Sequence, residues 1–407
     1  MKRNIILWCS AFLIGALYPG CYQKPDEQPS DGVETIKVSS LKKVPKLRYN
    51  DANYFEDCFL VKLETTDESL IKDINQIQLM DSVVYILDRT QAKILSFSYD
   101  GKYLGKIGVM GQGPEEYIAI SSFYVDKIDK SINLIDPMSM SIIRYSASGA
   151  FLNRAKHNNS NASFIKNAQV MNEDEIFCYS GSSWEDNSLY SIVSRSSFEK
   201  IKDICYYPAK TDAQISYTLS RQPFSIHDGK VTYGMLFSDV IERYEDGDSK
   251  PYLRFDHGKK SISPESLQQR LESKEYNYDY IQLMRSMAKE NDYTPGFLDV
   301  VESSRFIVAD FQVKESFMSV VVWDKKENKG IYVEEYGLIS TPDFGTMDFY
   351  DDGTIVKVWS NGSVNSFKSE INKDEALKKE YPADVEAILN QYDEDDNPVL
   401  VFYKLKG

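Results

Sequence analysis

The stretch Tyr85-Ile86-Leu87-Asp88 recurs 48 positions later as Asn133-Leu134-Ile135-Asp136. Both copies continue in register, because an apolar residue, an aromatic residue, a Gly and a Leu follow each Asp at the same four distances. A repeat of about 40 to 50 residues that contains several short strands is typical of a β-propeller blade. The matched residues are Ile94, Phe97, Gly101 and Leu104 in the first copy and Ile142, Tyr145, Gly149 and Leu152 in the second.

Weaker copies of this pattern extend over most of the chain. Asp-Gly pairs at 246–247 and 352–353 match the turn at 100–101, and Asp-Gly between apolar runs is a strong hairpin signal. We therefore expect an all-β fold, a six-bladed β-propeller that forms one domain over residues 33–407. The expected blades cover residues 60–110, 117–157, 163–208, 215–260, 297–340 and 341–407.

The composition of the 407 residues agrees with this fold class. Hydrophobic residues make up 42% of the chain, which is enough for a packed interior, and the 28 Tyr and 20 Phe favour strands. The formal net charge of −15 disfavours a nucleic-acid or anionic-lipid surface, which needs clustered Lys and Arg. We expect no nucleic-acid partner.

The first twenty residues read as a signal peptide. Lys2 and Arg3 precede the apolar run Ile5–Leu17, which is too short to span a bilayer comfortably. The segment Leu17-Tyr18-Pro19-Gly20-Cys21 resembles the lipobox of bacterial lipoproteins, and the resemblance implies cleavage after residue 20 and lipidation of Cys21. In the alternative interpretation the signal is cut elsewhere, or Cys21 is an ordinary thiol.

Residues 21–32 are polar and contain Pro and Gly, so we expect a tether rather than a part of the core. Lys24-Pro25-Asp26-Glu27 resembles the acidic export signal of Bacteroidetes surface lipoproteins, although a solvated linker has a similar composition. Of the remaining cysteines, Cys178 and Cys205 lie in strand patterns and are expected in the core; a bridge between these two stays open.

Two helical segments interrupt the strand pattern. A helical insertion is expected at about 262–292, where Ser263-Pro264-Glu265 places a cap, a first-turn Pro and an acid in order. Asn372-Lys373-Asp374-Glu375 resembles a capping box and predicts a short C-terminal helix. The chain then ends on the strand pattern Val399–Tyr403, which we expect to share a blade with the N-terminal segment and so to close the ring.

Three stretches together resemble the six-bladed β-propeller lipoproteins of Bacteroidetes, a family related to NHL-repeat propellers. They are Tyr85–Asp88, Gly108–Tyr117 and Asp396–Val401. The resemblance implies a propeller from residue 33 to the end and an outer-membrane lipoprotein in the periplasmic or surface leaflet. It implies no reaction.

The segment Gly108-Val109-Met110-Gly111-Gln112-Gly113-Pro114-Glu115-Glu116-Tyr117 lacks the Gly-Lys-Ser/Thr ending of a phosphate-binding loop. We interpret it as a connection between blades. The other interpretation is ligand contact by Gln112, Glu115 or Glu116 at the mouth of the channel. Asp88 and Asp136 hold equivalent repeat positions, and we expect them to bond backbone at a turn.

Catalytic residues are not identifiable from the sequence. The three histidines are scattered without ligand spacing, and no Gly-x-Ser-x-Gly motif occurs. We therefore expect a lipid-anchored binding or scaffold protein of the envelope, whose partner is a glycan, a peptide or a protein. The alternative is a metal-dependent enzyme of the lactonase or lyase type that holds a metal ion, such as Ca²⁺, in the channel. Apart from such an ion, no cofactor is expected.

Overall fold

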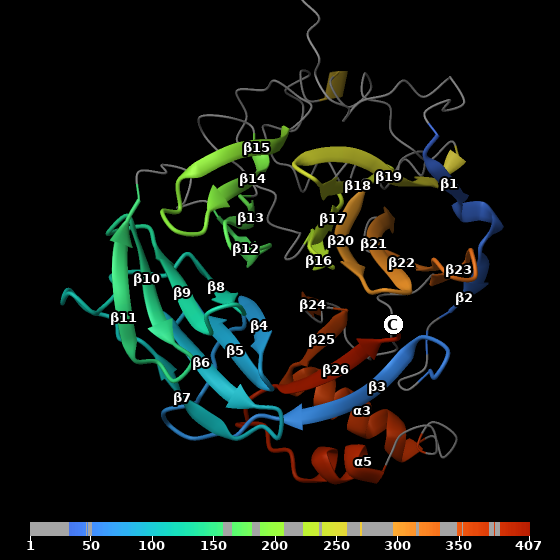
Figure 1. The fold of residues 1–407 in the computed structure, drawn as a ribbon. Coiled ribbons are helices and arrows are strands. Elements are labelled where there is room, and N and C mark those ends of the chain that lie inside the picture. Colours follow the sequence, from blue (N-terminus) through green and yellow to red (C-terminus); the bar gives the residue numbers. More distant parts are fainter. Residues whose placement is uncertain are drawn as a thin grey trace, which may run out of the picture.

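Six sheets, antiparallel apart from two added N-terminal strands, surround one axis in the computed structural model, and β4, β8, β12, β16, β20 and β24 lie toward the centre (Figure 1). The chain is thus the all-β, six-bladed propeller that the repeat predicts, and the prediction is confirmed. The structure describes residues 32–45, 47, 51–157, 165–180, 188–206, 223–235, 238–258, 269–270, 296–314, 317–333, 348–351, 353–373, 378 and 383–407.

Blades 1 to 3 are each formed by four consecutive strands. Their inter-strand pairing is antiparallel throughout. Blade 1 contains β4 (Gln76–Met80), β5 (Val83–Asp88), β6 (Lys93–Ser98) and β7 (Tyr103–Ile107); blade 2 contains β8 (Ser122–Asp126), β9 (Ser131–Asp136), β10 (Ser141–Ser146) and β11 (Phe151–Lys156); blade 3 contains β12 (Asn167–Val170), β13 (Glu175–Tyr179), β14 (Ser188–Ser194) and β15 (Lys200–Tyr206).

Blades 4 and 5 each have a fifth strand, which the sequence did not predict. The N-terminal strap, residues 34–44, adds β1 (Glu34–Lys37) to β19 and β2 (Lys42–Val44) to β23, both in parallel, with a short 3-10 helix, η1 (Val38–Ser40), between them. The other strands are β16 (Phe224–His227), β17 (Lys230–Tyr233), β18 (Val240–Glu245) and β19 (Asp248–Asp256) in blade 4, and β20 (Phe297–Glu302), β21 (Phe306–Lys314), β22 (Phe317–Asp324) and β23 (Lys329–Val333) in blade 5.

Blade 6 joins the two ends of the chain. Its inner strands are β24 (Asp348–Asp351) and β25 (Thr354–Trp359), followed by β26 (Val399–Leu405), which pairs with β3 (Phe55–Lys62). Strands from both ends of the chain thus close the ring, as predicted, but the partner of β26 is β3, whereas the N-terminal strap joins blades 4 and 5. The first predicted blade, 60–110, began too early, because residues 60–62 belong to blade 6 and the first strand of blade 1 begins at Gln76.

Two described helices lie between β25 and β26 and pack on blade 6: α3 (Asn361–Lys373) and α5 (Ala383–Asn390) (Figure 1). A short C-terminal helix is thus confirmed. The sequence did not predict α3, whose buried residues include Val364, Phe367 and Ile371. Asn372 lies in the last turn of α3, and the helix expected to follow it lies outside the described residues, apart from helical residue 378. The insertion expected at 262–292 lies outside the described residues, apart from helical residues 269–270.

The hydrophobic core lies between neighbouring blades rather than at the centre of the ring. One cluster joins blades 1 and 2 around Leu87, Phe123 and Ile143, and similar clusters fill other junctions. The repeated glycines follow from this packing. A Cβ on Gly101 would lie 2.0 Å from the Lys62 carbonyl oxygen, and one on Gly149 would lie 2.8 Å from that of Lys106, so each turn fits closely against the outer strand of the preceding blade.

Chain direction gives the ring two distinct faces. The connections from one blade to the next and the turns between second and third strands share one face, called here the crossover face. The turns that join the first to the second strand and the third to the fourth share the other, called the hairpin face. Both follow from the antiparallel order within each blade.

Candidate functional site

The Gly108–Tyr117 segment connects β7 of blade 1 to β8 of blade 2, as predicted, and lies on the crossover face. It folds back on itself, because the Gly111 amide donates to the Tyr117 carbonyl (2.8 Å) and the Tyr117 amide donates to the Val109 carbonyl (3.0 Å). The Tyr117 hydroxyl donates to the Ala92 carbonyl of blade 1 (2.8 Å). The Tyr145 hydroxyl donates to the Glu115 carbonyl (2.8 Å), so both blades hold the segment.

The three predicted ligand residues differ in their surroundings. The Glu116 carboxylate accepts from the Gly113 amide (2.8 Å) and fills the space beside Gly111, where a Cβ would lie 1.9 Å from its oxygen. Glu116 therefore shapes the segment. Gln112 and Glu115 are exposed, and within the described part of the chain their side chains make no hydrogen bond or ion pair.

Asp136 connects the end of the blade 1 to blade 2 connection with the turn between the second and third strands of blade 2. Its Oδ2 accepts from the Ile118 amide (2.9 Å), and its Oδ1 accepts from the Met138 amide (3.0 Å). The Ser139 hydroxyl also donates to Oδ2 (2.7 Å). One fully buried carboxylate thus fixes the start of blade 2 beside the turn between its second and third strands.

Five apolar residues in or beside these two segments are exposed by 43% to 69%, and we call them the blade 2 patch. Backbone contacts bring them near one another, through Tyr117 with Val109 and Met110 and through Asp136 with Ile118 and Met138. Exposed apolar residues that gather on one surface often mark interaction sites, and Met is common where binding surfaces adapt to a partner. Gln112 and Glu115 lie in the same segment as two of the five residues. The blade 2 patch consists of Val109, Met110, Ile118, Met138 and Met140.

Blade 1 contains the same turn without the patch. Asp88 accepts from the Lys72 amide (2.7 Å) and from the Gln91 amide (2.9 Å) and is also fully buried. The predicted backbone role of Asp88 and Asp136 is therefore confirmed. Judged by the bonds to Asp88 and Asp136 and by the shared turn, Ile118, Met138 and Met140 correspond to Lys72, Thr90 and Ala92. The turn has the same backbone in both blades, since the φ values of Ala92 and Met140 are 48° and 49°.

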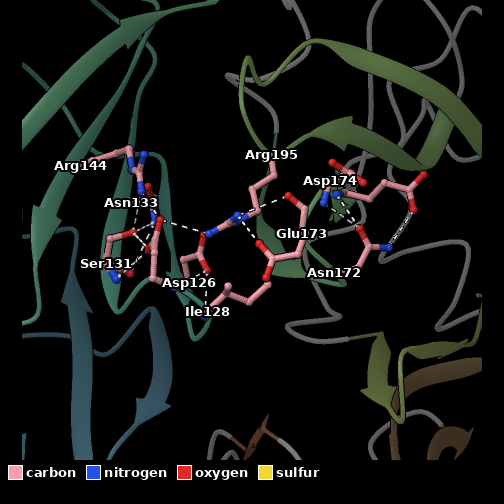
Figure 2. Close-up of polar contacts among 11 residues, drawn as sticks. Asp126, Ile128, Ser131, Asn133, Arg144, Asn172, Glu173, Asp174 and Arg195 are labelled. Carbon is pink, nitrogen blue, oxygen red and sulfur yellow. Dashed lines mark hydrogen bonds and ion pairs between the residues drawn. The ribbon is translucent and has the colours of Figure 1, made fainter.

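A network of charges on the hairpin face joins blades 2 and 3. Figure 2 shows Arg195 extending toward Asp126 of blade 2, with Nε 2.6 Å from Oδ2, and toward Glu173, with Nη1 3.1 Å from Oε2. Arg195 Nη2 lies 3.1 Å from Asp129, which also pairs with Arg144. The bond from Asp126 raises the pKa of Arg195 above its ordinary value. Since each of these carboxylates has a cationic partner, the network fits a structural clamp rather than acid–base chemistry.

Blades 4 and 5 are joined by a similar buried cluster on the same face. Glu302 accepts from Arg243 (2.5 and 2.7 Å), from Lys325 Nζ (2.6 Å) and from the Thr232 hydroxyl. Burial opposes ionisation of Glu302, but Arg243, Lys325 and Thr232 outweigh it and hold the pKa of the carboxyl below its ordinary value. Both oxygens of this carboxylate accept hydrogen bonds, so we assign Glu302 a role in the stability of the fold.

Two buried glutamine side chains of blade 1 bond the inner strands of blades 2 and 3. Gln76 Nε2 donates to the Phe123 carbonyl (2.8 Å), while Gln78 Oε1 accepts from the Val125 amide (2.7 Å) and Gln78 Nε2 donates to the Ala168 carbonyl of blade 3 (3.2 Å). Among the described residues, no three His, Cys, Asp or Glu side chains lie where they could hold a metal ion. A channel Ca²⁺ stays a prediction without support from these residues.

Cys178 is a fully buried free thiol, as expected for a core residue, so it forms no bridge to Cys205. Burial raises the pKa of this thiol well above its ordinary value and makes it unreactive. The side chain of Cys205, Cys21 and the expected tether lie outside what the structure describes. No helix in the described part of the chain is long and apolar enough to cross a membrane.

Sequence reasoning placed Gln112 and Glu115 on the surface but missed the apolar residues around them. A signal was present, because the second copy of the repeat has Met138 and Met140 where the first has Thr90 and Ala92. The contact of Arg195 with Asp126 had no such signal, since 69 positions separate the two residues.

Comparison with solved structures agrees with the fold. A protein from Bacteroides fragilis whose name describes it as exported is 18% identical, with a TM-score of 0.67 over 92% of this chain and 100% of its own. A member of the DUF4221 family from Bacteroides vulgatus is 13% identical, with a TM-score of 0.51 over 86% of this chain and 97% of its own. No curated protein matches. A family model described as a domain of unknown function (DUF4934) matches residues 33–404, so the chain belongs to the DUF4934 family.

Proposed function

We propose that this protein is a non-catalytic binding module of the bacterial cell envelope, and that the blade 2 patch binds a partner protein. The proposal depends on one observation: five exposed apolar residues lie on the crossover face, and the buried carboxylate of Asp136 binds the backbone amides of two of them, Ile118 and Met138. A backbone held in this way loses little further conformational entropy on binding, which favours affinity.

The chemistry of the blade 2 patch favours a protein over a glycan. Sugar-binding surfaces commonly present aromatic rings to the sugar, whereas the five residues here are aliphatic or thioether side chains. Glu115 is exposed in the same segment and the chain carries a net charge of −15. We therefore infer a partner segment that combines apolar with basic side chains.

Export and anchoring complete the proposal. The apolar run before Cys21 and the lipobox-like residues support secretion and lipidation, which would hold the propeller at the outer membrane. The relative from Bacteroides fragilis whose name describes it as exported is consistent with that location. A fluorinated or radiolabelled palmitate incorporated into the wild type but not into Cys21→Ser would establish the anchor.

Replacing the patch by its blade 1 counterpart tests the binding function. The variant Ile118→Lys/Met138→Thr/Met140→Ala carries the residues that the same turn tolerates in blade 1. Its affinity for a labelled amphipathic peptide of Leu and Lys, measured by fluorescence anisotropy, should fall about tenfold or more, because apolar contact area is lost. Light scattering at the same concentrations reports whether a second copy occupies the patch instead.

A matched control separates lost binding from lost folding. Leu104→Thr/Leu152→Thr removes two aliphatic side chains of similar exposure from the outer strands of blades 1 and 2. It should bind the peptide like the wild type. Equal affinity of the wild type and the patch variant, or equal losses in the patch variant and the control, would contradict the proposal.

A further inference from the structure

A second candidate binding site lies far from the blade 2 patch, under the N-terminal strap. A groove of about 1160 Å³ runs between this strap and the outer strands of blade 5, on the side of the hairpin face. Ligand sites typically occupy about 300 to 1,000 Å³, so the groove has room for an oligomeric ligand. Nothing in the proposed protein-binding function uses it.

The charge of the groove is opposite to that of the chain. Among the described residues, four basic and two acidic ones line it, although the whole chain carries a net charge of −15. The two carboxylates are already engaged, since Asp324 accepts from Arg305 (2.7 and 3.0 Å) and Asp51 accepts from the amides of Asn53. The basic residues are Lys37, Lys42, Arg305 and Lys329.

Lysines of the strap supply the charge that remains. Lys37 and Lys42 are exposed, and no ion pair to either is present within the described part of the chain. Lys329 is 70% exposed and approaches Glu327 only at 3.6 Å. Arg305 is paired with Asp324, and Asp51 keeps its negative charge, so the lysines leave the described lining with a net formal charge of about +2, and such a concave surface attracts anions.

Between the lysines the groove offers the neutral groups that sugars need. Thr35, Ser40 and Asn328 line it and carry hydroxyl and amide groups. The Thr35 and Ser40 hydroxyls donate to the Val33 and Lys37 carbonyls and keep their capacity to accept a hydrogen bond. Tyr54 is half-buried and contributes aromatic surface, and aromatic faces pack against the C–H faces of a sugar ring. Hydroxyl, amide, aromatic and ammonium groups are thus present together along one elongated surface.

We propose that the groove under the strap binds an acidic oligosaccharide, with carboxylate or sulfate groups of the sugar paired to Lys37, Lys42 and Lys329. The sugar backbone then lies along the strap, where Tyr54 and the hydroxyl groups contact it. This site is independent of the blade 2 patch, so failure of either proposal leaves the other intact.

Calorimetry on the full chain tests the site with two probes, a galacturonate trimer for carboxylate and a sulfated disaccharide for sulfate, beside neutral maltotriose. We expect at least one acidic probe to bind, maltotriose not to bind, and added salt to weaken binding. Lys37→Gln/Lys42→Gln should weaken the acidic probe about tenfold or more, because two charged hydrogen bonds are lost. Lys37→Arg/Lys42→Arg should retain most of the affinity.

Lys102→Gln/Lys106→Gln is the matched control, with Lys102 just before and Lys106 on the outer strand of blade 1, since it removes the same charge outside the groove and should bind like the wild type. The patch variant Ile118→Lys/Met138→Thr/Met140→Ala should also bind like the wild type. Absence of binding by both acidic probes would overturn the proposal. So would equal losses in the two Lys→Gln pairs, or binding only to vesicles that contain an anionic lipid.

Discussion

Blades 1 and 2 build the same turn on the same face and present different side chains on it. Asp88 and Asp136 each accept from a backbone amide of the preceding connection and from the turn that follows. Around that shared frame, blade 1 carries Lys72, Thr90 and Ala92, whereas blade 2 carries Ile118, Met138 and Met140. The comparison teaches that the repeat fixes the backbone, while the exposed positions of each copy are free to acquire a function.

The largest effect is expected from Glu302, which touches neither turn and so supplies a reference for lost stability without altered binding. Glu302→Gln leaves Arg243 and Lys325 without their carboxylate and should lower the free energy of unfolding by about 3 kcal/mol. Urea denaturation measures the change. Peptide binding at the blade 2 patch should be unchanged while the protein is folded.

Lowering the pH should reduce the free energy of unfolding through the same residue, Glu302. The pKa of Glu302 is lower in the folded protein than in the unfolded chain, so its ionised form contributes stability at pH values above about 4.3. That contribution is lost as the pH falls through the lower, folded pKa. Wild-type stability should therefore drop below about pH 4 more steeply than that of Glu302→Gln. Parallel curves for the two proteins would exclude Glu302 as a cause.

A smaller and symmetrical effect is expected at the two turns. Asp88→Asn or Asp136→Asn places an NH₂ group where a carboxylate oxygen accepted two hydrogen bonds, so each should cost about 2 kcal/mol. Only Asp136→Asn should also weaken peptide binding. Equal binding by both variants would show that the frame of blade 2 does not position the patch.

A gain in stability is expected where the turns require a positive φ. Ala92 and Met140 adopt φ values near 50°, which favour Gly. Ala92→Gly and Met140→Gly should each stabilise the fold by about 0.5 kcal/mol, after the greater entropy of the unfolded Gly chain is counted. Thermal denaturation compares the two. A loss of stability confined to Met140→Gly would mean that the Met140 side chain contributes to packing.

The smallest change in stability is expected when the patch is copied onto blade 1. Lys72→Ile/Thr90→Met/Ala92→Met alters exposed or half-exposed positions and should shift the free energy of unfolding by no more than about 0.5 kcal/mol. A second equivalent of the Leu and Lys peptide should then bind, as titration would show. Unchanged stoichiometry would imply that Val109 and Met110, which blade 1 does not reproduce, are essential.

Local patterns predicted the fold well because they reflect local constraints. The matched distances after Asp88 and Asp136 reproduce a buried carboxylate and a tight turn, and both residues behave as expected. Leu104 and Leu152 also hold matched positions, but they are half-exposed because outer strands alternate inward and outward side chains.

Features that depend on distant contacts could not be predicted. The parallel pairing of β1 with β19 places Glu34 beside Leu253, and no local sequence pattern predicts a contact between residues so far apart in the chain. The groove under the strap is a product of this pairing. The blade 2 patch was within reach, since a position-by-position comparison of the two copies reveals Met138 and Met140 as departures from the first.

The seam in blade 6 has a consequence for biosynthesis. The Asn397 amide donates to the Thr65 hydroxyl although 332 positions separate the two residues. In the same blade, β3 can pair with β26 only after residues 399–405 have been added to the chain. The ring therefore cannot close until these residues have been synthesised. Such late closure suits the export proposed above, because a chain that crosses a membrane through a narrow translocon has to stay unfolded on the way.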